Sequence, residues 1–260
     1  MSVNGYTYAN KMLNLPDEYK VSGMPNGNQR IYEGKDIYRW EMRQFAGLDE
    51  KGNSLWYMDQ DILDDAGNVV GVEKVTTGDA TEATQYLLEK SALPDFTGGL
   101  NTTLRWKSLD LTIMTNFQFG GYGYDYDFSA FSSANFPMNR LKNYADAWNP
   151  ETGKGSAPIW NTNDSNINAS SDRFLISKTY FNLRNITLGY TFPANWMSKI
   201  GIKSVRVYFA CDNVFFASKR KGYDPRTSMG GQGATVALNS VDGTYYSPIR
   251  TTSVGLNINF

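Results

Sequence analysis

Apolar and polar side chains alternate along several long stretches of this chain. In residues 109–121 (LDLTIMTNFQFGG), most odd-numbered positions are apolar, and the even-numbered positions are polar apart from Met114. Since successive side chains of a β-strand point to opposite faces, a period of two predicts a strand with one apolar and one polar face. The apolar set is Leu109, Leu111, Ile113, Phe117 and Phe119, and the polar set is Asp110, Thr112, Asn116 and Gln118.

The same pattern predicts seven strands of about 10 to 13 residues each. They span residues 3–12, 36–47, 96–107, 109–121, 180–192, 202–213 and 251–260. Strands of soluble proteins typically have about 5 to 6 residues, whereas strands that cross a bilayer at a tilt need about 9 to 11. The polar faces carry Arg, Lys, Asp and Asn, which suit a water-filled lumen better than a closed soluble core.

The stretch 180–192 changes phase part-way along. Phe181 and Leu183 alternate in one phase, whereas Ile186 and Leu188 alternate in the other. One extra residue in a strand produces such a change, so the sequence predicts a β-bulge near Arg184 or Asn185.

The connections between these strands differ sharply in length. Lys107 and Ser108 predict a tight hairpin turn, and residues 193–201 form a modest connection. Three connections are much longer and show no strand pattern: residues 49–95, 120–178 and 217–248. Within the first of them, only residues 77–90 have a helical character. Short turns on one side and long loops on the other are typical of outer-membrane barrels.

Aromatic residues gather where the predicted strands meet the short connections. They are Trp106, Tyr190, Phe192 and Trp196. In a barrel they would form a girdle at the membrane–water interface. Alternatively, they would cap the core of a soluble β-sandwich.

Composition restricts the chemistry that this chain can perform. The 260 residues have a formal net charge of -1, no histidine and a single cysteine, Cys211. The absence of histidine removes the commonest general base and the commonest zinc ligand, and the near-neutral charge gives no basic patch for nucleic acid. Neither a complete phosphate loop nor a complete calcium loop is present. We therefore expect no enzyme activity, no cofactor and no metal ion.

Membrane-targeting patterns and transmembrane helices are not apparent in the sequence. The N-terminal residues lack the basic and apolar regions of a signal peptide, and no stretch approaches about 18 consecutive apolar residues. Barrel strands have low average hydropathy, so this does not exclude a membrane barrel. Seven strands do not close an even-numbered barrel, which leaves two interpretations: a soluble β-sandwich with long strands, or the C-terminal part of a larger barrel.

Several blocks of the sequence resemble SusC/RagA-type TonB-dependent outer-membrane transporters. The blocks occur in the order of that family and cover nearly the whole chain: residues 34–57, 77–99, 91–125, 178–193, 205–226 and 245–260. They include the pattern Leu-Arg-Asn-Ile-Thr-Leu-Gly-Tyr at 183–190 and the Gly-Tyr-Asp-Pro loop at 222–225. The resemblance implies an all-β fold, namely an antiparallel up-and-down transmembrane β-barrel segment of about seven strands with long extracellular loops.

The resemblance also implies a setting and partners. A full family member has a signal peptide, an N-terminal plug and a barrel of about 22 strands. Residues 1–260 would be the C-terminal barrel part, with the plug and signal peptide absent from this chain. The expected partners are a SusD-like surface lipoprotein, the TonB complex acting through the missing plug, the outer-membrane assembly machinery and the lipid bilayer. The whole importer would take up oligosaccharides or peptides across the outer membrane.

Candidate substrate-binding residues lie in the long loop 120–178. Aromatic rings bind the flat faces of sugars and apolar peptide side chains, which singles out Tyr122, Tyr124, Tyr126, Phe128, Trp148 and Trp160. Alternatively, the residues at 122–128 simply continue the preceding strand and anchor the loop, and the two tryptophans are similar cases. Phe260, which ends an alternating apolar run, is similar to the signal that the outer-membrane assembly machinery recognises.

Two other functions remain as alternatives. One is a secreted β-sandwich module that binds glycans through the loop at 122–128. The other is a glycosidase that depends on two carboxylates, which no motif in the sequence supports.

Overall fold

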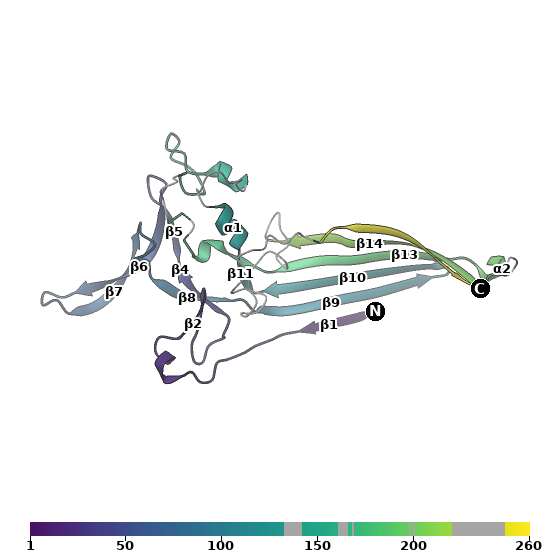
Figure 1. The fold of residues 1–260 in the computed structure, drawn as a ribbon, viewed down its shortest axis with the longest axis horizontal. Coiled ribbons are helices and arrows are strands. Elements are labelled where there is room, and N and C mark those ends of the chain that lie inside the picture. Colours follow the sequence, from purple (N-terminus) through teal and green to yellow (C-terminus); the bar gives the residue numbers. More distant parts are fainter. Residues whose placement is uncertain (133–141, 161–165, 168, 198, 200, 220–247) are drawn as a thin grey trace.

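The computed structural model describes residues 1–132, 142–160, 166–167, 169–197, 199, 201–219 and 248–260. Figure 1 shows a long six-stranded sheet on one side of the molecule and a layer of shorter elements on the other. We call the end of the long strands next to Lys107 the turn end, and the end next to Gly120 the loop end. The shorter elements, in residues 10–93 and 121–178, form the loop layer.

The main sheet joins its strands in the order β1-β9-β10-β13-β14-β15, and all neighbouring strands are antiparallel. The strands are β1 (Ser2–Tyr6), β9 (Pro94–Trp106), β10 (Leu109–Gly120), β13 (Tyr180–Thr191), β14 (Ser204–Ser218) and β15 (Thr251–Asn259). Strands β9, β10, β13 and β14 have 12 to 15 residues, which is long enough to cross a bilayer at a tilt. The sheet is open, with β1 and β15 at its two edges, and it confirms the predicted antiparallel β fold.

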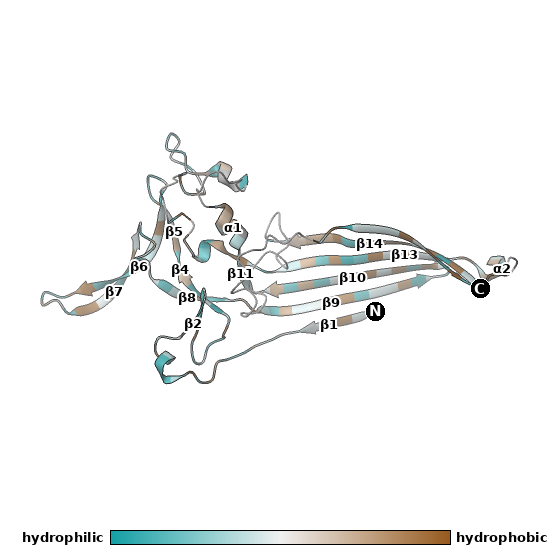
Figure 2. Ribbon diagram, viewed as in Figure 1, coloured by the Kyte–Doolittle hydropathy of each residue, from teal (hydrophilic) through white to brown (hydrophobic). Residues whose placement is uncertain are grey.

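The pairing register sorts apolar and polar side chains onto opposite faces of the main sheet. One row across five strands is entirely apolar: Leu104, Leu111, Leu188, Phe209 and Val254. All of these except Leu111 are between 46 % and 76 % exposed, so the row faces outwards rather than into a core. Figure 2 shows the resulting alternation of hydrophobic and hydrophilic positions along the strands. Such a face suits contact with lipid, as predicted from the alternation.

The bulge that the sequence predicts in β13 is present at Arg184. Leu183 pairs with Thr115 of β10. The next pair joins Asn185 to Met114, so Arg184 is left without a partner in β10. The extra residue puts the apolar residues of both halves of β13 on the same face.

The tight hairpin between β9 and β10 is also confirmed. Trp106 pairs with Leu109, so the turn consists only of Lys107 and Ser108. Lys107 has a φ of 54°, in the left-handed region that two-residue hairpin turns require.

Residues 36–47 do not form a strand of the main sheet, which corrects the prediction of seven long strands. They form β4 (Arg39–Arg43) and β5 (Phe45–Leu48), which belong to two smaller sheets. Trp40 and Met42 are buried in the loop layer. A period of two is the same in any half-buried strand, so the alternation does not indicate to which sheet a strand belongs. The predicted first strand, 3–12, is likewise shorter and ends at Tyr6.

In its described residues, the loop layer contains three small sheets and several short helices. The sheets join β2 (Met24–Asn26), β3 (Gln29–Ile31), β4 and β8 (Gln85–Ser91); β5, β6 (Ser54–Leu63) and β7 (Val69–Thr77); and β11 (Tyr122–Tyr124) and β12 (Leu175–Ser177). Its helices are η1 (Asp17–Tyr19), α1 (Tyr126–Phe131), η2 (Lys142–Asp146) and η3 (Asp172–Phe174), whereas α2 (Ala194–Met197) lies at the turn end. None of the helices in the described ranges is long and apolar enough to span a bilayer.

The prediction of a helix at residues 77–90 is wrong. Strand β7 ends at Thr77, and β8 begins at Gln85 and pairs with β4. Between them, the Asp79 carboxylate accepts a hydrogen bond from the backbone N–H of Thr81 at 2.8 Å. This local bond favours a turn over a helix, and the pairing with β4 determines the strand that follows.

Residues 49–95 contain a turn signal that the sequence analysis did not use. Two hairpin turns in this stretch share the motif Asp-x-x-Gly-Asn. The motif joins β5 to β6 at Asp49–Asn53 and β6 to β7 at Asp64–Asn68. In both turns the aspartate carboxylate accepts a hydrogen bond from the backbone N–H of the asparagine, at 2.7 Å and 2.8 Å, respectively. The glycine of each motif has a φ of 83°, which residues with a Cβ rarely adopt.

A compact aromatic core holds the loop layer together. Its buried members include Trp40, Met42, Leu88, Tyr124 and Phe174. The indole Nε1 of Trp40 donates a hydrogen bond to the backbone oxygen of Tyr122 at 3.1 Å. Strands from the first third of the chain therefore pack against the segment that follows β10.

Candidate functional site

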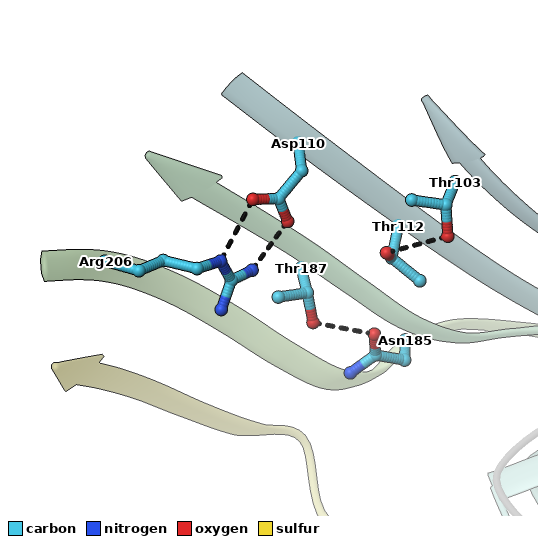
Figure 3. Close-up of polar contacts among 6 residues, drawn as sticks. All are labelled: Thr103, Asp110, Thr112, Asn185, Thr187 and Arg206. Atoms are coloured by element: carbon cyan, nitrogen blue, oxygen red, sulfur yellow. Dashed lines mark hydrogen bonds and ion pairs between the residues drawn. The ribbon is translucent and has the colours of Figure 1, made fainter. Parts of the chain in front are cut away.

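The polar face of the main sheet carries an ion pair close to its turn end. Asp110 of β10 and Arg206 of β14 meet across β13 (Figure 3). Arg206 donates from Nε to Asp110 Oδ1 at 3.0 Å and from Nη2 to Oδ2 at 2.6 Å. This two-point contact fixes the guanidinium plane and pairs both charges on the polar face.

Two glycines make room for the side chains that cross the sheet. Gly189 pairs with Asp110, and a Cβ at Gly189 would overlap the Arg206 guanidinium and the Asp110 carboxylate. A Cβ at Gly255 of β15 would similarly overlap the ring of Tyr208. Arg206 lies 5.1 Å from the centroid of the Tyr208 ring, a cation–π distance. Two long side chains of β14 therefore span the polar faces of β10, β13, β14 and β15.

Hydrogen bonds between side chains continue along the polar face towards the loop end. They join Thr103 to Thr112 at 3.1 Å, Asn185 to Asp212 at 2.8 Å, and Asn182 to Asn116 at 2.7 Å. In Figure 3, Thr187 also donates to Asn185. A face on which polar side chains pair with one another in this way tolerates water, as the lumen of a barrel requires.

At the loop end, the aromatic residues predicted at 122–128 meet in one cluster. Tyr122 and Tyr124 lie in β11, whereas Tyr126 and Phe128 lie in α1. The carboxylate of Asp125 caps this helix by accepting a hydrogen bond from the backbone N–H of Phe128 at 2.9 Å. The helix begins within the stretch that the sequence suggested to be a continued strand, so the four rings do not form a flat row.

Packing makes this cluster part of the core of the loop layer. Phe174 is fully buried, and its ring contacts Tyr124 and Phe128 edge-on, with centroid distances of 6.0 Å and 5.3 Å. Tyr124 is only 3 % exposed, and burial raises the pKa of its hydroxyl. The rings of Tyr122, Tyr126 and Phe128 are half-buried, so only their rims are accessible to a ligand.

The two predicted tryptophans lie outside this cluster. Trp148 packs onto the turn between β5 and β6, where a Cβ at Gly52 would overlap its ring. The neighbouring backbone N–H of Ile159 donates to the Gly52 oxygen at 2.8 Å. Trp160 is 45 % exposed and has the most accessible ring of the six predicted aromatic residues.

Lys178 connects the main sheet to the loop layer, and no sequence pattern pointed to it. It is only 8 % exposed, and its Nζ donates to the backbone oxygen of Ala92 at 3.3 Å. Its own backbone oxygen accepts a bond from Gln118 Nε2 at 3.3 Å. Burial lowers the pKa of the Lys178 amine to about 8.

An open pocket of about 350 Å³ lies where the loop layer meets the start of β9. Its lining includes Tyr8, Asn10, Asp36 and Asp95. Asp36 is held in place because its Oδ1 accepts bonds from Asn10 Nδ2 and from the backbone N–H of Tyr38, both at 2.9 Å. These residues come from three separate stretches of the chain, so only the tertiary structure brings them together.

In the described parts of the chain, no three Cys, Asp or Glu side chains lie close enough together to bind a metal ion.

Comparisons with known proteins extend over most of the chain. No family model matches it. TonB-dependent receptor P3 of Formosa agariphila is 24% identical over 96% of this chain and 26% of its own length. TonB-dependent receptor SusC of Bacteroides thetaiotaomicron is 26% identical over 79% of this chain and 19% of its own length. The structure of the RagAB peptide transporter matches with a TM-score of 0.68 and 25% identity, over 92% of this chain and 24% of the matched chain. The RagAB peptide importer in the open-open state matches with a TM-score of 0.73 and 23% identity, over 99% of this chain and 26% of the matched chain.

These matches confirm the resemblance to SusC/RagA-type TonB-dependent receptors. The chain spans about a quarter of the length of the relatives that it matches. The matched proteins are named as receptors, transporters or importers and not as enzymes, which agrees with the predicted lack of enzyme activity. The match to a SusC/RagA-type fold over nearly the whole chain is inconsistent with the alternative of a two-sheet β-sandwich.

Proposed function

We propose that this chain is the C-terminal part of the β-barrel of a SusC/RagA-like, TonB-dependent nutrient importer of the outer membrane. The observation that carries the proposal is the main sheet, which has an exposed apolar face, a hydrogen-bonded polar face and two open edges. In lipid, open edges are costly, so β1 and β15 would pair with further strands of the same barrel. The plug and the signal peptide would belong to the remainder of the importer.

In this proposal, the turn end faces the periplasm and the loop layer faces the cell exterior. Phe260 lies directly after β15, whose last residue pairs with Ser204 at the turn end. It is 77 % exposed, so its ring is accessible to the outer-membrane assembly machinery. We assign it the role of assembly signal.

The loop layer would form the mouth through which cargo enters, together with a SusD-like surface lipoprotein. Cargo would contact Trp160 and the accessible rims of Tyr122, Tyr126, Phe128 and Trp148, whereas Tyr124 would anchor the loop. Such rings accept both sugar faces and apolar peptide side chains, so the cargo is an oligosaccharide or a peptide. The relation to a peptide importer, RagAB, supports the peptide class. Energy would come from the TonB complex acting on the plug.

Uptake measurements test this function directly. Cells that carry the complete importer and cells that lack it are supplied with fluorescent peptides and fluorescent oligosaccharides. We expect uptake of one cargo class that disappears when either the importer or TonB is deleted. Uptake that persists without TonB, or no uptake of either class, would contradict the proposal.

A further inference from the structure

The hairpin of β6 and β7 projects from the loop layer on the side away from the main sheet (Figure 1). Its base is buried, because Trp56 is 0 % exposed and contacts Ala80 and Ala83. Beyond Met58 and Val75, both strands extend into solvent. The hairpin therefore presents its tip as a free, two-stranded ribbon.

The tip of this hairpin is apolar although it is exposed. Its aliphatic residues are between 45 % and 63 % exposed: Ile62, Leu63, Val69, Val70 and Val72. Leu63 pairs with Val69 directly next to the turn, and Figure 2 shows the hydrophobic colour along β7. An isolated two-stranded ribbon is only marginally stable in water. Because Ile62 and Leu63 are consecutive, the exposed aliphatic side chains lie on both faces of the tip, and such exposed apolar surface marks an interaction site.

The charges around the tip are almost all negative. Between Ser54 and Thr77 there are five carboxylates and one lysine. The carboxylates are Asp59, Asp61, Asp64, Asp65 and Glu73, and the lysine is Lys74. A surface that covers the tip must therefore be apolar at its centre and basic at its rim.

Lys74 is engaged at the base of the hairpin and fixes its direction. Its Nζ lies 4.4 Å from the ring centroid of Tyr57 and 4.3 Å from that of Tyr86, and it donates to Gln44 Oε1 at 2.6 Å. Tyr86 donates to Asp59 Oδ1 at 2.6 Å. Burial, together with this hydrogen bond, raises the pKa of Tyr86 to about 12, so its hydroxyl remains a donor at neutral pH. The base of the ribbon is thus tied to the loop layer before any partner binds, which lowers the entropic cost of binding.

We infer that the tip of the β6–β7 hairpin docks into an apolar cleft, flanked by lysine or arginine, on the SusD-like lipoprotein. This inference rests on the proposed function for the identity of the partner. A membrane fits less well, because the tip lies at the opposite end of the molecule from the strands that would cross the bilayer. Anionic lipid headgroups would also repel the carboxylates.

Binding of the complete importer to the lipoprotein tests the inference. The double variant Leu63→Asn and Val69→Asn removes the apolar pair while keeping a polar, exposed hairpin. We expect it to raise the dissociation constant about tenfold or more, as loss of a central apolar contact does. The control Thr76→Asn changes an exposed position of β7 near the base and should bind like the wild type. A second variant, Asp61→Lys, should weaken binding and reduce its salt dependence.

Three outcomes would overturn the inference. The first is a double variant that binds the lipoprotein like the wild type while the wild type both binds and imports; this leaves the proposed function intact. The second is a double variant that still binds the lipoprotein but no longer binds vesicles of phosphatidylcholine and phosphatidylglycerol. This result would indicate a membrane contact instead. The third is a wild-type importer that does not bind the lipoprotein, which also removes the partner from the proposed function. Circular dichroism of each purified variant establishes that the barrel has folded.

Discussion

At the scale of single residues, the position of Gly189 shows how a missing side chain shapes the polar face. Asp110 and Arg206 lie on strands that are separated by β13, and they meet only because Gly189 presents no Cβ between them. The contact is partly exposed, with side-chain accessibilities of 29% for Arg206 and 19% for Asp110, so its Coulomb energy is reduced by solvent. Steric fit therefore contributes more than charge at this site.

We predict that Gly189→Ala destabilises the barrel by roughly 1–3 kcal/mol, because the new methyl group forces the ion pair apart. The free energy of unfolding is measured by urea titration of the complete protein in detergent. The matched comparison is the same substitution in an Arg206→Ala background, where the cost should be much smaller. Equal costs in both backgrounds would show that the ion pair is not the cause.

Lys178 gives a pH prediction at the same scale. Burial lowers the pKa of its amine to about 8, below the value of an unfolded chain, so the folded state favours the neutral form. Above the unfolded pKa the Lys178 amine is neutral in both states and costs no stability. The folded protein loses stability as the pH falls from there through about 8, because the unfolded chain binds the proton more readily. Lys178→Met should remove this pH dependence and raise the unfolding temperature at pH 7. If the wild type and the variant have parallel profiles between about pH 7 and pH 10, the amine does not titrate in this way.

At the scale of elements, the bulge in β13 controls which side chains lie on the apolar face of the main sheet. Arg184 is the unpaired residue, and it restores the phase of Phe181 and Leu183 to that of Ile186. Without it, the first half of β13 would turn its apolar side chains to the polar face. The register of the whole strand therefore depends on one residue that contributes little packing of its own.

We predict that deleting Arg184 prevents assembly of the barrel, whereas Arg184→Ala changes the free energy of unfolding by no more than about 0.5 kcal/mol. The deletion is expected to act through the register, so the identity of the side chain matters little. The assay is the amount of heat-modifiable, folded protein in outer-membrane fractions. An assembled deletion variant would mean that β13 can re-register without loss.

The two faces of β10 give a further prediction. Ile113 lies on the apolar face, and Met114, its neighbour, lies on the polar face and is 37 % exposed. Ile113→Lys should cost about 2–4 kcal/mol if this position is near the bilayer midplane, whereas Met114→Lys should be tolerated in the lumen. Insertion into vesicles, followed by urea unfolding, distinguishes them. Similar costs for both substitutions would argue against a lipid-facing side.

At the scale of the whole molecule, the main sheet and the loop layer have different requirements. The loop layer has its own core around Trp40, Tyr124 and Phe174. The main sheet has an exposed apolar face and two edge strands, β1 and β15, whose outer backbone groups would be unsatisfied in lipid. The chain covers about a quarter of the length of its relatives. In the proposed function, further strands of the same barrel pair with these two edges.

We therefore predict that cells producing only residues 1–260 take up none of the labelled peptides or oligosaccharides. The reason is that the main sheet of the described residues is open, and in the proposed function the plug that couples to TonB belongs to the remainder of the importer. Cells with the complete importer serve as the positive control in the same uptake assay. Uptake above background by residues 1–260 alone would refute this expectation.

Much of the main sheet could be predicted from the sequence because its features are local. The alternation along 109–121, the two-residue turn at Lys107 and the phase change around Arg184 are all confirmed. Residues 36–47 were predicted as strand but assigned to the wrong sheet, and residues 77–90 were wrongly predicted as a helix. The reason is that β4 and β8 form through pairing with each other and through burial of Trp40 and Met42. The candidate aromatic residues could be selected by type, but their burial could not.

The sequence by itself determined the long strands of the main sheet, their two faces and the bulge, since each depends on side chains that are neighbours along the chain. Only the tertiary structure decided that Tyr122, Tyr124, Tyr126 and Phe128 pack around Phe174. It alone also brought Arg206 over Gly189, enclosed Lys178 against Ala92, and directed the β6–β7 hairpin into solvent. The physical reason is that burial and ion pairing depend on groups far apart in the chain, whose contacts exist only after the strands have paired.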